Sequence, residues 1–480
     1  MKNNERREHR SARQFFISVT WFVFACGSLD AGAAVEFHPH AEVSVGWTDN
    51  PTLVGDDDPS KHSAYVVQAN PGFLWKQTGQ YFNSGLDYTM QNVFFRDSQE
   101  RNQTYHQATG QFDATIVPNY FYLDANGTYS QVLIDAHQPA NYRNFFNVTN
   151  QTDALAIAAT PRLRHDFGQV HVDASYSRGR VSYKRTEGPL GSPSDADTED
   201  KNLLLTGVED DALVTWAADY QSQYAKYSQA TEFRYDHAYG ELGWLLGRSV
   251  RLIGRGGAES DPALSVTKGG LDHSYWEGGL RWQPGPRTIA EGFYGKRFYG
   301  RSFNARLNHQ AKIVFWEFSY VEGAQTQAQE LIAYSATGKP LVANAVPGTA
   351  GFLQLTDQVY VRKTAQGTLR LTGRRTEVEL VATDYRRTFL NTALGSDRQT
   401  GGSLRVTRTL AERMHFEIGG SINNSVLEDG SRFRDLLANI GLTRDLTRKI
   451  ALSLTGFRYS RSGGVDYKAN SVNLSLTGHF

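Results

Sequence analysis

The feature that most constrains the fold is a two-residue alternation of apolar and polar side chains that recurs along the chain. In KIALSLTGF (449–457), Ile450, Leu452 and Leu454 alternate with Ser453 and Thr455. Successive side chains of a β-strand point to opposite faces, so this segment is a strand with one apolar and one polar face. FYLDANGTY, VHVDASY, EVELVATDY and RMHFEIGG repeat the pattern. After residue 34 we find no sustained i, i+3, i+4 pattern, which argues against a mainly helical protein.

The connectors between these segments alternate between two kinds. Short ones carry Gly, Pro, Asn or Asp, as at 117–120, 283–287 and 371–375, and longer polar ones include 49–62, 135–149, 185–200 and 259–270. A one-sided apolar strand also fits a soluble sandwich, whose apolar face points into a core. Regular alternation of long and short connectors is instead typical of outer-membrane barrels, which have long extracellular loops and short periplasmic turns.

Strand counting predicts an all-β fold, a single large antiparallel transmembrane β-barrel of about 22 strands within a range of roughly 18–24. Strands are expected to start near residues 37, 63, 80, 103, 119, 150, 168, 200, 212, 231, 249, 271, 287, 301, 312, 353, 375, 398, 412, 432, 448 and 467. An unpaired backbone group is costly in hydrocarbon, so the sheet must close. We therefore expect the last strand to pair with the strand at 37–48, where Val43, Val45 and Trp47 would face lipid.

The first residues resemble an export signal. KNNERREHR is polar and largely charged, FFISVTWFVFACG (15–27) is the only long apolar run, and AGAA follows at 31–34. A charged start, a short apolar stretch and small residues make a secretory signal peptide, and the run is too short for a comfortable membrane-spanning helix. We expect cleavage after Ala33 or Ala34, which removes residues 1–33 and leaves a barrel of residues 34–480 in the outer membrane of a Gram-negative bacterium. A lipid anchor on Cys26 and twin-arginine export are weaker alternatives.

Charge and composition limit the classes of function that the chain can have. The chain has 50 basic and 50 acidic residues, a formal net charge of +0, which gives no electrostatic case for a nucleic-acid partner. Aromatic residues make up 12%, which fits the aromatic girdles of a membrane barrel. No local motif sets apart a nucleophile and its base, so we expect no enzymatic activity and no cofactor or metal. His38 with His40, and the acidic 55–60 segment, could hold a metal ion, but we favour lumen-facing polar residues and a solvated loop.

The connector at 326–352 is the longest and is less polar than the others. Its apolar residues are Leu331, Ile332, Leu341, Val342 and Val346. A solvated loop gains little from such side chains, so we predict that this connector folds into or over the lumen as a constriction or lid. Packing against neighbouring loops is the alternative.

The width of the lumen raises a second question. Transporter barrels of 22 strands are usually plugged, but only a few residues separate the cleavage site from the first strand, so we expect no N-terminal plug domain. Charged residues are expected to brace the lumen instead: Arg162, Arg164, Arg178, Arg180, Lys184, Glu377 and Glu379.

Several short segments carry a family resemblance. GWTDNPTLV (46–54), NPGFLWKQTGQ (70–80), GTYSQVLI (127–134), TPRLRHDFG (160–168) and RFYGRSFNARLNHQAKIVFWEFSY (297–320) follow one another along the chain. In these segments the chain resembles the PEP-CTERM system-associated outer membrane proteins. The resemblance implies an outer-membrane channel or export conduit associated with exopolysaccharide and exosortase systems, and it implies no site residue. A structural or docking barrel whose loops bind surface polymer or protein is the alternative, and a barrel enzyme is a third hypothesis.

The chain ends in SVNLSLTGHF, which has the alternation of a lipid-facing strand. This ending resembles the signal read by the barrel-assembly machinery, and its candidate residues are Phe480, Leu476 and Leu474. The expected partners are therefore outer-membrane lipid, the barrel-assembly machinery and, through the resemblance, polysaccharide or proteins of an export complex.

Overall fold

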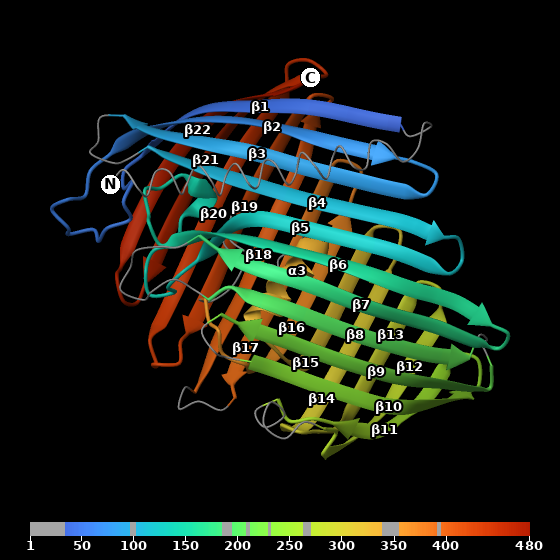
Figure 1. Cartoon of the computed structure of the whole chain (residues 1–480). Coiled ribbons are helices and arrows are strands. Elements are labelled where there is room, and N and C mark those ends of the chain that lie inside the picture. Colours follow the sequence, from blue (N-terminus) through green and yellow to red (C-terminus); the bar gives the residue numbers. More distant parts are fainter. Residues whose placement is uncertain are drawn as a thin grey trace.

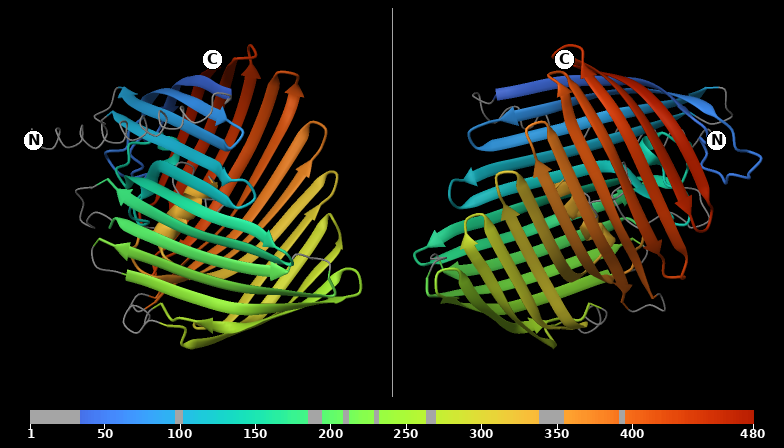
Figure 2. Two further views of the ribbon diagram at one scale, coloured as in Figure 1. Left: turned by 45° about the vertical axis from the view of Figure 1, so that its right-hand side comes forward. Right: turned by 180° about the vertical axis from the view of Figure 1, so that it is seen from behind.

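A computed structural model describes residues 34–96, 102–184, 194–207, 212–228, 232–262, 270–337, 355–390 and 395–480. Twenty-two strands form one antiparallel sheet that closes into a barrel (Figures 1 and 2). The predicted fold class and strand number are confirmed. The expected signal peptide of residues 1–33 lies outside the described residues.

The strands follow one another in chain order. They are β1 (Ala34–Thr48), β2 (Ala64–Thr78), β3 (Phe82–Arg96), β4 (Gln103–Val117), β5 (Phe121–Leu133), β6 (Gln151–Phe167), β7 (Val170–Tyr183), β8 (Ala196–Gly207), β9 (Val214–Tyr227), β10 (Glu232–Leu246), β11 (Val250–Glu259), β12 (His273–Gly285), β13 (Thr288–Arg297), β14 (Gly300–Gln310), β15 (Val314–Gln325), β16 (Tyr360–Thr372), β17 (Thr376–Phe389), β18 (Ser396–Ala411), β19 (Met414–Val426), β20 (Arg432–Asp445), β21 (Ile450–Ser462) and β22 (Tyr467–His479). A 3-10 turn, η1 (Tyr142–Asn144), follows β5, and a helix, α3 (Gln327–Thr337), follows β15.

The barrel closes where the sequence predicts. β1 pairs with β2 on one side and with β22 on the other, and Val45 lies opposite Leu474. The observed strand starts agree with the expected ones to within a few residues, apart from β16. That strand starts at Tyr360 rather than near 353, because the preceding segment is engaged elsewhere: the Thr356 backbone N–H donates to Gln327 Oε1 of α3.

The outer face of the sheet carries apolar side chains and the inner face carries polar ones, which is the reverse of the arrangement in a soluble protein. Val43 and Val45 are each 52% exposed, whereas Ser44 between them is 1% exposed. Large apolar side chains are exposed in the same way on nearly all strands, while buried polar side chains point inward. An exposed apolar belt of this extent is stable only in lipid. The chain is therefore a transmembrane β-barrel of the outer-membrane type, and the soluble-sandwich alternative is excluded.

The two ends of the barrel differ. Short turns such as 118–120, 168–169 and 247–249 lie at the end that also holds the starts of β1 and β3, and Asn119, Gly168 and Gly247 adopt positive φ angles of 66°, 67° and 68° there. The longer connectors lie at the other end. Among the described residues, no helix is long and apolar enough to cross a membrane.

Candidate functional site

The helix α3 begins at a capping box. The Gln329 side-chain oxygen accepts a hydrogen bond from the Thr326 backbone N–H at 2.9 Å, and the Thr326 hydroxyl accepts one from the Gln329 N–H at 3.5 Å. This reciprocal pair satisfies two N–H groups that a helix start leaves free. Good helix formers follow, so the segment is helical although it connects two strands.

This helix leaves β15 but packs on a distant part of the barrel wall. It contacts β4, β5, β6, β7 and β8, which lie far from β15 around the barrel, and Figure 2 shows it enclosed by strands. Leu331 is 1% exposed and packs in one apolar cluster with Ala154 and Ala156 of β6. At Gly179 of β7, an added Cβ would lie 2.9 Å from Ile332 Cδ1. Small residues on the wall therefore make room for the helix.

Hydrogen bonds hold both ends of α3 to that wall. Near the helix end, the Asn126 side chain of β5 donates to the Ser335 hydroxyl, and Gln111 Nε2 of β4 donates to the Ala336 carbonyl at 3.4 Å. Near the helix start, the Ala328 N–H donates to the Tyr227 hydroxyl at 3.2 Å. These contacts come from three different strands, β4, β5 and β9, and fix the orientation of the helix.

A buried carboxylate ties α3 to strands on the other side. Glu330 is 1% exposed and accepts hydrogen bonds from the Tyr385 hydroxyl of β17 at 3.0 Å and from Arg362 Nη1 of β16 at 3.4 Å. Burial raises the pKa of the Glu330 carboxyl, and the Arg362 charge opposes this increase. The helix thus links β16–β17 to β4–β8 through the inside of the barrel.

The connector of residues 134–150, termed the inner loop, also turns into the barrel. Tyr142, Phe145 and Phe146 are buried against the inward face of β21, and the Phe145 and Phe457 rings lie 5.1 Å apart. The segment 135–149, expected from the sequence to be one of the longer polar connectors, is therefore largely buried against the barrel wall. The aromatic side chains gain more from the inward wall than from solvent.

Polar side chains set the shape of the inner loop. Asn141 Oδ1 accepts a hydrogen bond from the Phe146 N–H at 2.9 Å, and Asn150 Nδ2 donates to the Asp135 carbonyl at 2.6 Å. Arg461 of β21 donates to the Ala136 carbonyl at 3.0 Å and to the Gln138 carbonyl at 2.8 Å. The loop backbone thereby keeps hydrogen-bond partners although it lies inside the barrel.

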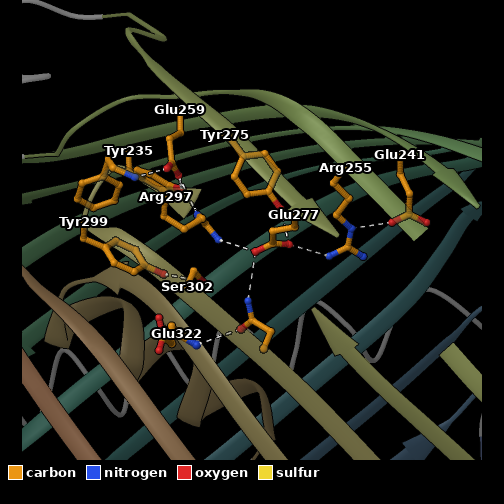
Figure 3. Close-up of polar contacts among 12 residues, drawn as sticks. Tyr235, Glu241, Arg255, Glu259, Tyr275, Glu277, Arg297, Tyr299, Ser302 and Glu322 are labelled. Atoms are coloured by element: carbon orange, nitrogen blue, oxygen red, sulfur yellow. Dashed lines mark hydrogen bonds and ion pairs between the residues drawn. The ribbon is translucent and has the colours of Figure 1, made fainter. Parts of the chain in front are cut away.

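A third inward feature is a network of charges and phenols on β10–β14 (Figure 3). Arg297 Nε donates to Glu259 Oε2 at 2.9 Å, and Arg297 Nη2 donates to the Tyr235 hydroxyl at 2.5 Å. The Tyr235 hydroxyl in turn donates to Glu259 at 2.6 Å. Glu259 is fully buried, so its charge is supported by donors from two other strands.

A second set of contacts extends the network toward β10. Arg255 Nε donates to Glu241 at 2.7 Å and Nη1 donates to Glu277 at 3.3 Å, while the Tyr275 hydroxyl donates to Glu277 at 2.5 Å. The Arg255 guanidinium lies 4.0 Å from the Phe293 ring centroid. The wall here is a rigid polar surface of guanidinium groups and aromatic rings.

The charges that were expected to brace the lumen pair with adjacent strands instead. Arg164 binds Asp173 of the neighbouring strand at 2.9 Å, and Arg370 lies 3.5 Å from Glu379 of its neighbour. Arg180 lies on the outer face, because its neighbour Val181 is fully buried against α3. The expected bracing by these charges is therefore wrong, and α3 makes the connection across the barrel.

The remaining predicted residues fall in separate places. Of the five constriction residues, Leu331 and Ile332 lie in α3, and Leu341, Val342 and Val346 lie outside the described residues. The proposed assembly residues Leu474, Leu476 and Phe480 are 47%, 46% and 65% exposed, with the two leucines in the apolar belt.

The two candidate metal-binding segments have ordinary polar partners. His38 lies 3.3 Å from Glu36, His40 lies 3.3 Å from the Thr89 hydroxyl, and Asp56 pairs with Lys61 at 2.8 Å. The part of the chain that the structure describes contains no group of three or more His, Cys, Asp or Glu side chains arranged to hold a metal ion.

Two local signals for the inward segments were present in the sequence. Thr326 followed three residues later by Gln329 is a capping box ahead of a less polar run, and it marks the start of α3. NYRNFF (141–146) places three aromatic residues among asparagines, a poor composition for a solvated loop. Neither signal identifies the wall that receives the segment.

Comparisons with known proteins give only distant structural likenesses. No protein-family model and no curated protein matches the sequence. A mutant of the ferric enterobactin receptor PfeA from Pseudomonas aeruginosa has 10% identity and a TM-score of 0.46, over 93% of this chain and 81% of that one. The siderophore receptor PirA from Acinetobacter baumannii has 10% identity and a TM-score of 0.43, over 92% and 80%. A loop L8 deletion mutant of OmpT, an outer membrane protein of Vibrio cholerae, has 11% identity and a TM-score of 0.33, over 94% and 100%.

Proposed function

We propose that this protein is a channel of the Gram-negative outer membrane whose lumen is restricted by α3 and the inner loop. The observation that carries the proposal is that α3 is tied to β16–β17 through Glu330 and to β4–β8 through Leu331 and Ser335. Barrels of this strand number are too wide for wall side chains alone to fill. Segments that cross the inside therefore limit what passes.

The contacts of α3 suggest which end of the helix is easier to release. Ser335 and Glu330 are both buried, but Glu330 is paired with Arg362, whereas the far end of the helix is held by neutral hydrogen bonds from Asn126 and Gln111. Neutral hydrogen bonds contribute about 1 kcal/mol each, less than the roughly 3–5 kcal/mol lost when one partner of a buried ion pair is taken away and the other stays buried. In our proposal, the Ser335 end moves away from β5 when the channel opens.

A reversible cross-link tests this restriction. Residues 34–480 contain no cysteine, so Asn126→Cys combined with Ser335→Cys in that part of the chain can be joined selectively, by a disulfide or by a short bis-thiol reagent. We expect low single-channel conductance in planar bilayers when the pair is joined and higher conductance after reduction. The Ser335→Cys single variant is the control. Equal conductance in both states would contradict a moving α3.

A deletion tests the larger constriction prediction. Removal of residues 330–350 takes away all five predicted apolar residues, including Leu341, Val342 and Val346. We expect a larger unitary conductance than in the wild-type protein. Removal of 56–60, an exposed part of the β1–β2 connector, is the control. Unchanged conductance after the first deletion would exclude the constriction role.

For the cargo, we propose an exopolysaccharide, as the family resemblance implies. The wall of β10–β14 offers aromatic rings and guanidinium groups, which stack on and hydrogen-bond to sugars or anionic polymers. Deletion of the gene should reduce secreted polysaccharide, and normal secretion would refute this cargo. A silent barrel that still retains polymer on a column would favour the alternative of a docking barrel whose loops bind polymer.

We also propose that residues 1–33 are removed on export and that Phe480, Leu476 and Leu474 are read by the barrel-assembly machinery. The Phe480 N–H donates to the Pro39 carbonyl at 2.8 Å, so the residue lies at the seam between β22 and β1. Phe480→Ser should slow folding into liposomes that contain the machinery and leave unassisted folding in detergent unchanged. An equal effect in both settings would indicate a structural role only.

A further inference from the structure

Four arginines form a row on the outer face of the barrel at the end with the long connectors. Arg386 of β17 lies directly opposite Arg398 of β18. Val426 of β19 lies between Arg398 and Arg432 of β20, directly opposite each of them. Arg434 lies two residues further along β20. Cross-strand neighbours are about 4.8 Å apart, so the row extends over about 14 Å. We call Arg386, Arg398, Arg432 and Arg434 the arginine row.

The side-chain alternation places this row on the lipid side. In β17, Tyr385 and Arg387 are buried inside the barrel, so Arg386 between them points outward. In β20, Phe433 and Asp435 are buried inside, so Arg432 and Arg434 also point outward and are exposed. The same parity applies to β18, where Asp397 forms a buried pair with Arg387 and Arg398 faces out.

The row lies at the edge of the apolar belt. Leu436 is 40% exposed and follows Arg434 by two positions on β20, which corresponds to about 7 Å along the strand. Val426, within the row, is 37% exposed. A position directly above the hydrocarbon contact is the level of lipid headgroups.

The charges of the row are largely unbalanced by the protein. Arg398 forms a two-point contact with Asp384 at 2.7 and 2.8 Å. Arg386, Arg432 and Arg434 make no ion pair with any described carboxylate. Arg386 donates to the Ser396 hydroxyl at 3.4 Å and Arg434 to Asn424 Oδ1 at 2.9 Å, both neutral groups. Like charges directly opposite one another destabilise an antiparallel pair. Asp384 offsets the charge of Arg398, and the charges of Arg386, Arg432 and Arg434 are left for an external anion.

At the same end of the barrel, several basic residues on other strands are paired with carboxylates. On the outer face of β7–β10, Lys226 pairs with Glu232 at 3.0 Å, Arg234 with Asp236 at 2.9 Å, and Arg180 lies 3.9 Å from Asp197. These three basic residues each have a carboxylate partner within the protein. Arg386, Arg432 and Arg434 differ from these three residues in having no described carboxylate partner.

We propose that the arginine row binds the phosphate groups of an anionic glycolipid in the outer leaflet. Guanidinium groups form paired, charge-assisted hydrogen bonds with phosphate, and the adjoining apolar belt would hold the acyl chains of the same molecule. This site lies on the outer face, and it is independent of what passes through the lumen.

The test uses the full-length mature barrel in a nonionic detergent and lipid A as the probe. Lipid A carrying its phosphates should be retained in native mass spectrometry and should raise the heat-unfolding midpoint of the wild-type protein. The variant with Arg386→Gln, Arg432→Gln and Arg434→Gln should bind it at least about tenfold more weakly. Dephosphorylated lipid A should bind both proteins equally weakly.

Two controls separate the outcomes. Arg180→Gln with Lys226→Gln and Arg234→Gln removes the same charge from β7–β10 and should change the affinity by less than about twofold. Inorganic phosphate should not reproduce the stabilisation. Equal lipid A binding by wild type and the row variant, an equal loss in the control variant, or full stabilisation by phosphate alone would each overturn the proposal. If the triple variant does not fold, Arg432→Gln with Arg434→Gln carries the same test with a smaller loss.

Discussion

At the scale of single residues, Gly46 of β1 determines how closely the inner loop can approach the wall. An added Cβ would lie 2.6 Å from Phe145 Cζ and 2.9 Å from the Val472 carbonyl oxygen, and the latter is backbone that cannot move easily. Gly46→Ala should therefore displace Phe145 and cost about 1–3 kcal/mol. A lower heat-unfolding midpoint would show the loss of stability, and faster trypsin cleavage after Arg143 would show the displacement of the inner loop. Gly254→Ala is the control, since no heavy atom lies within 4 Å there.

His137 gives the inner loop a dependence on pH. Its Nδ1 contacts Asp135 at 2.8 Å and its Nε2 contacts Asp429 of the β19–β20 connector at 3.0 Å. Burial lowers the pKa of His137, but the hydrogen bonds and charges of both aspartates outweigh it and raise the pKa above the usual value. The stabilisation is complete below about pH 6.5, the unfolded value, and is lost as pH rises through the folded value.

The expected observation is hydrogen exchange in residues 134–150 that becomes faster as pH rises above about 6.5, after correction for intrinsic exchange. His137→Gln should remove this step while the exchange in β21 stays unchanged. A step that persists in the variant would assign the effect to another group.

At the scale of elements, α3 depends on its capping box because it is a helix of only 11 residues. Gln329→Ala removes the acceptor for the Thr326 N–H and the donor to Asp200, and it should destabilise the helix by about 1 kcal/mol. We expect more frequent high-conductance events in planar bilayers. Ala333→Gln, at an exposed helix position, is the matched control, and indistinguishable recordings from the two variants would contradict a capping role.

At the scale of the whole molecule, the closed barrel depends on an uninterrupted apolar belt. Leu474 of β22 lies between Val45 of β1 and Leu454 of β21 and is 47% exposed to lipid. Leu474→Lys should cost about 2–4 kcal/mol, because a charge near the bilayer centre lacks water. Ser475→Lys, on the inward face of the same strand, should cost much less. Urea unfolding in liposomes measures both, and equal costs would contradict the assignment of the faces.

The amino-acid sequence was enough to predict the barrel, the positions of nearly all strands, the closure of β1 on β22 and the lipid-facing residues. Each of these follows from a local rule: a two-residue alternation, a turn residue, or the need to pair every backbone group in lipid. The same rule holds along each strand, so a short segment carries enough information to place it.

The paths of the long connectors could be found only from the folded structure. The inner loop turns inward because Phe145 meets Phe457, more than 300 residues away, and α3 crosses the barrel because Leu331 meets Ala156. The arginine row likewise appears only when the registers of β17–β20 align Arg386 with Arg432. These contacts join residues that are distant in the chain, and no local pattern encodes their distance, because it is set by the diameter and register of the closed sheet.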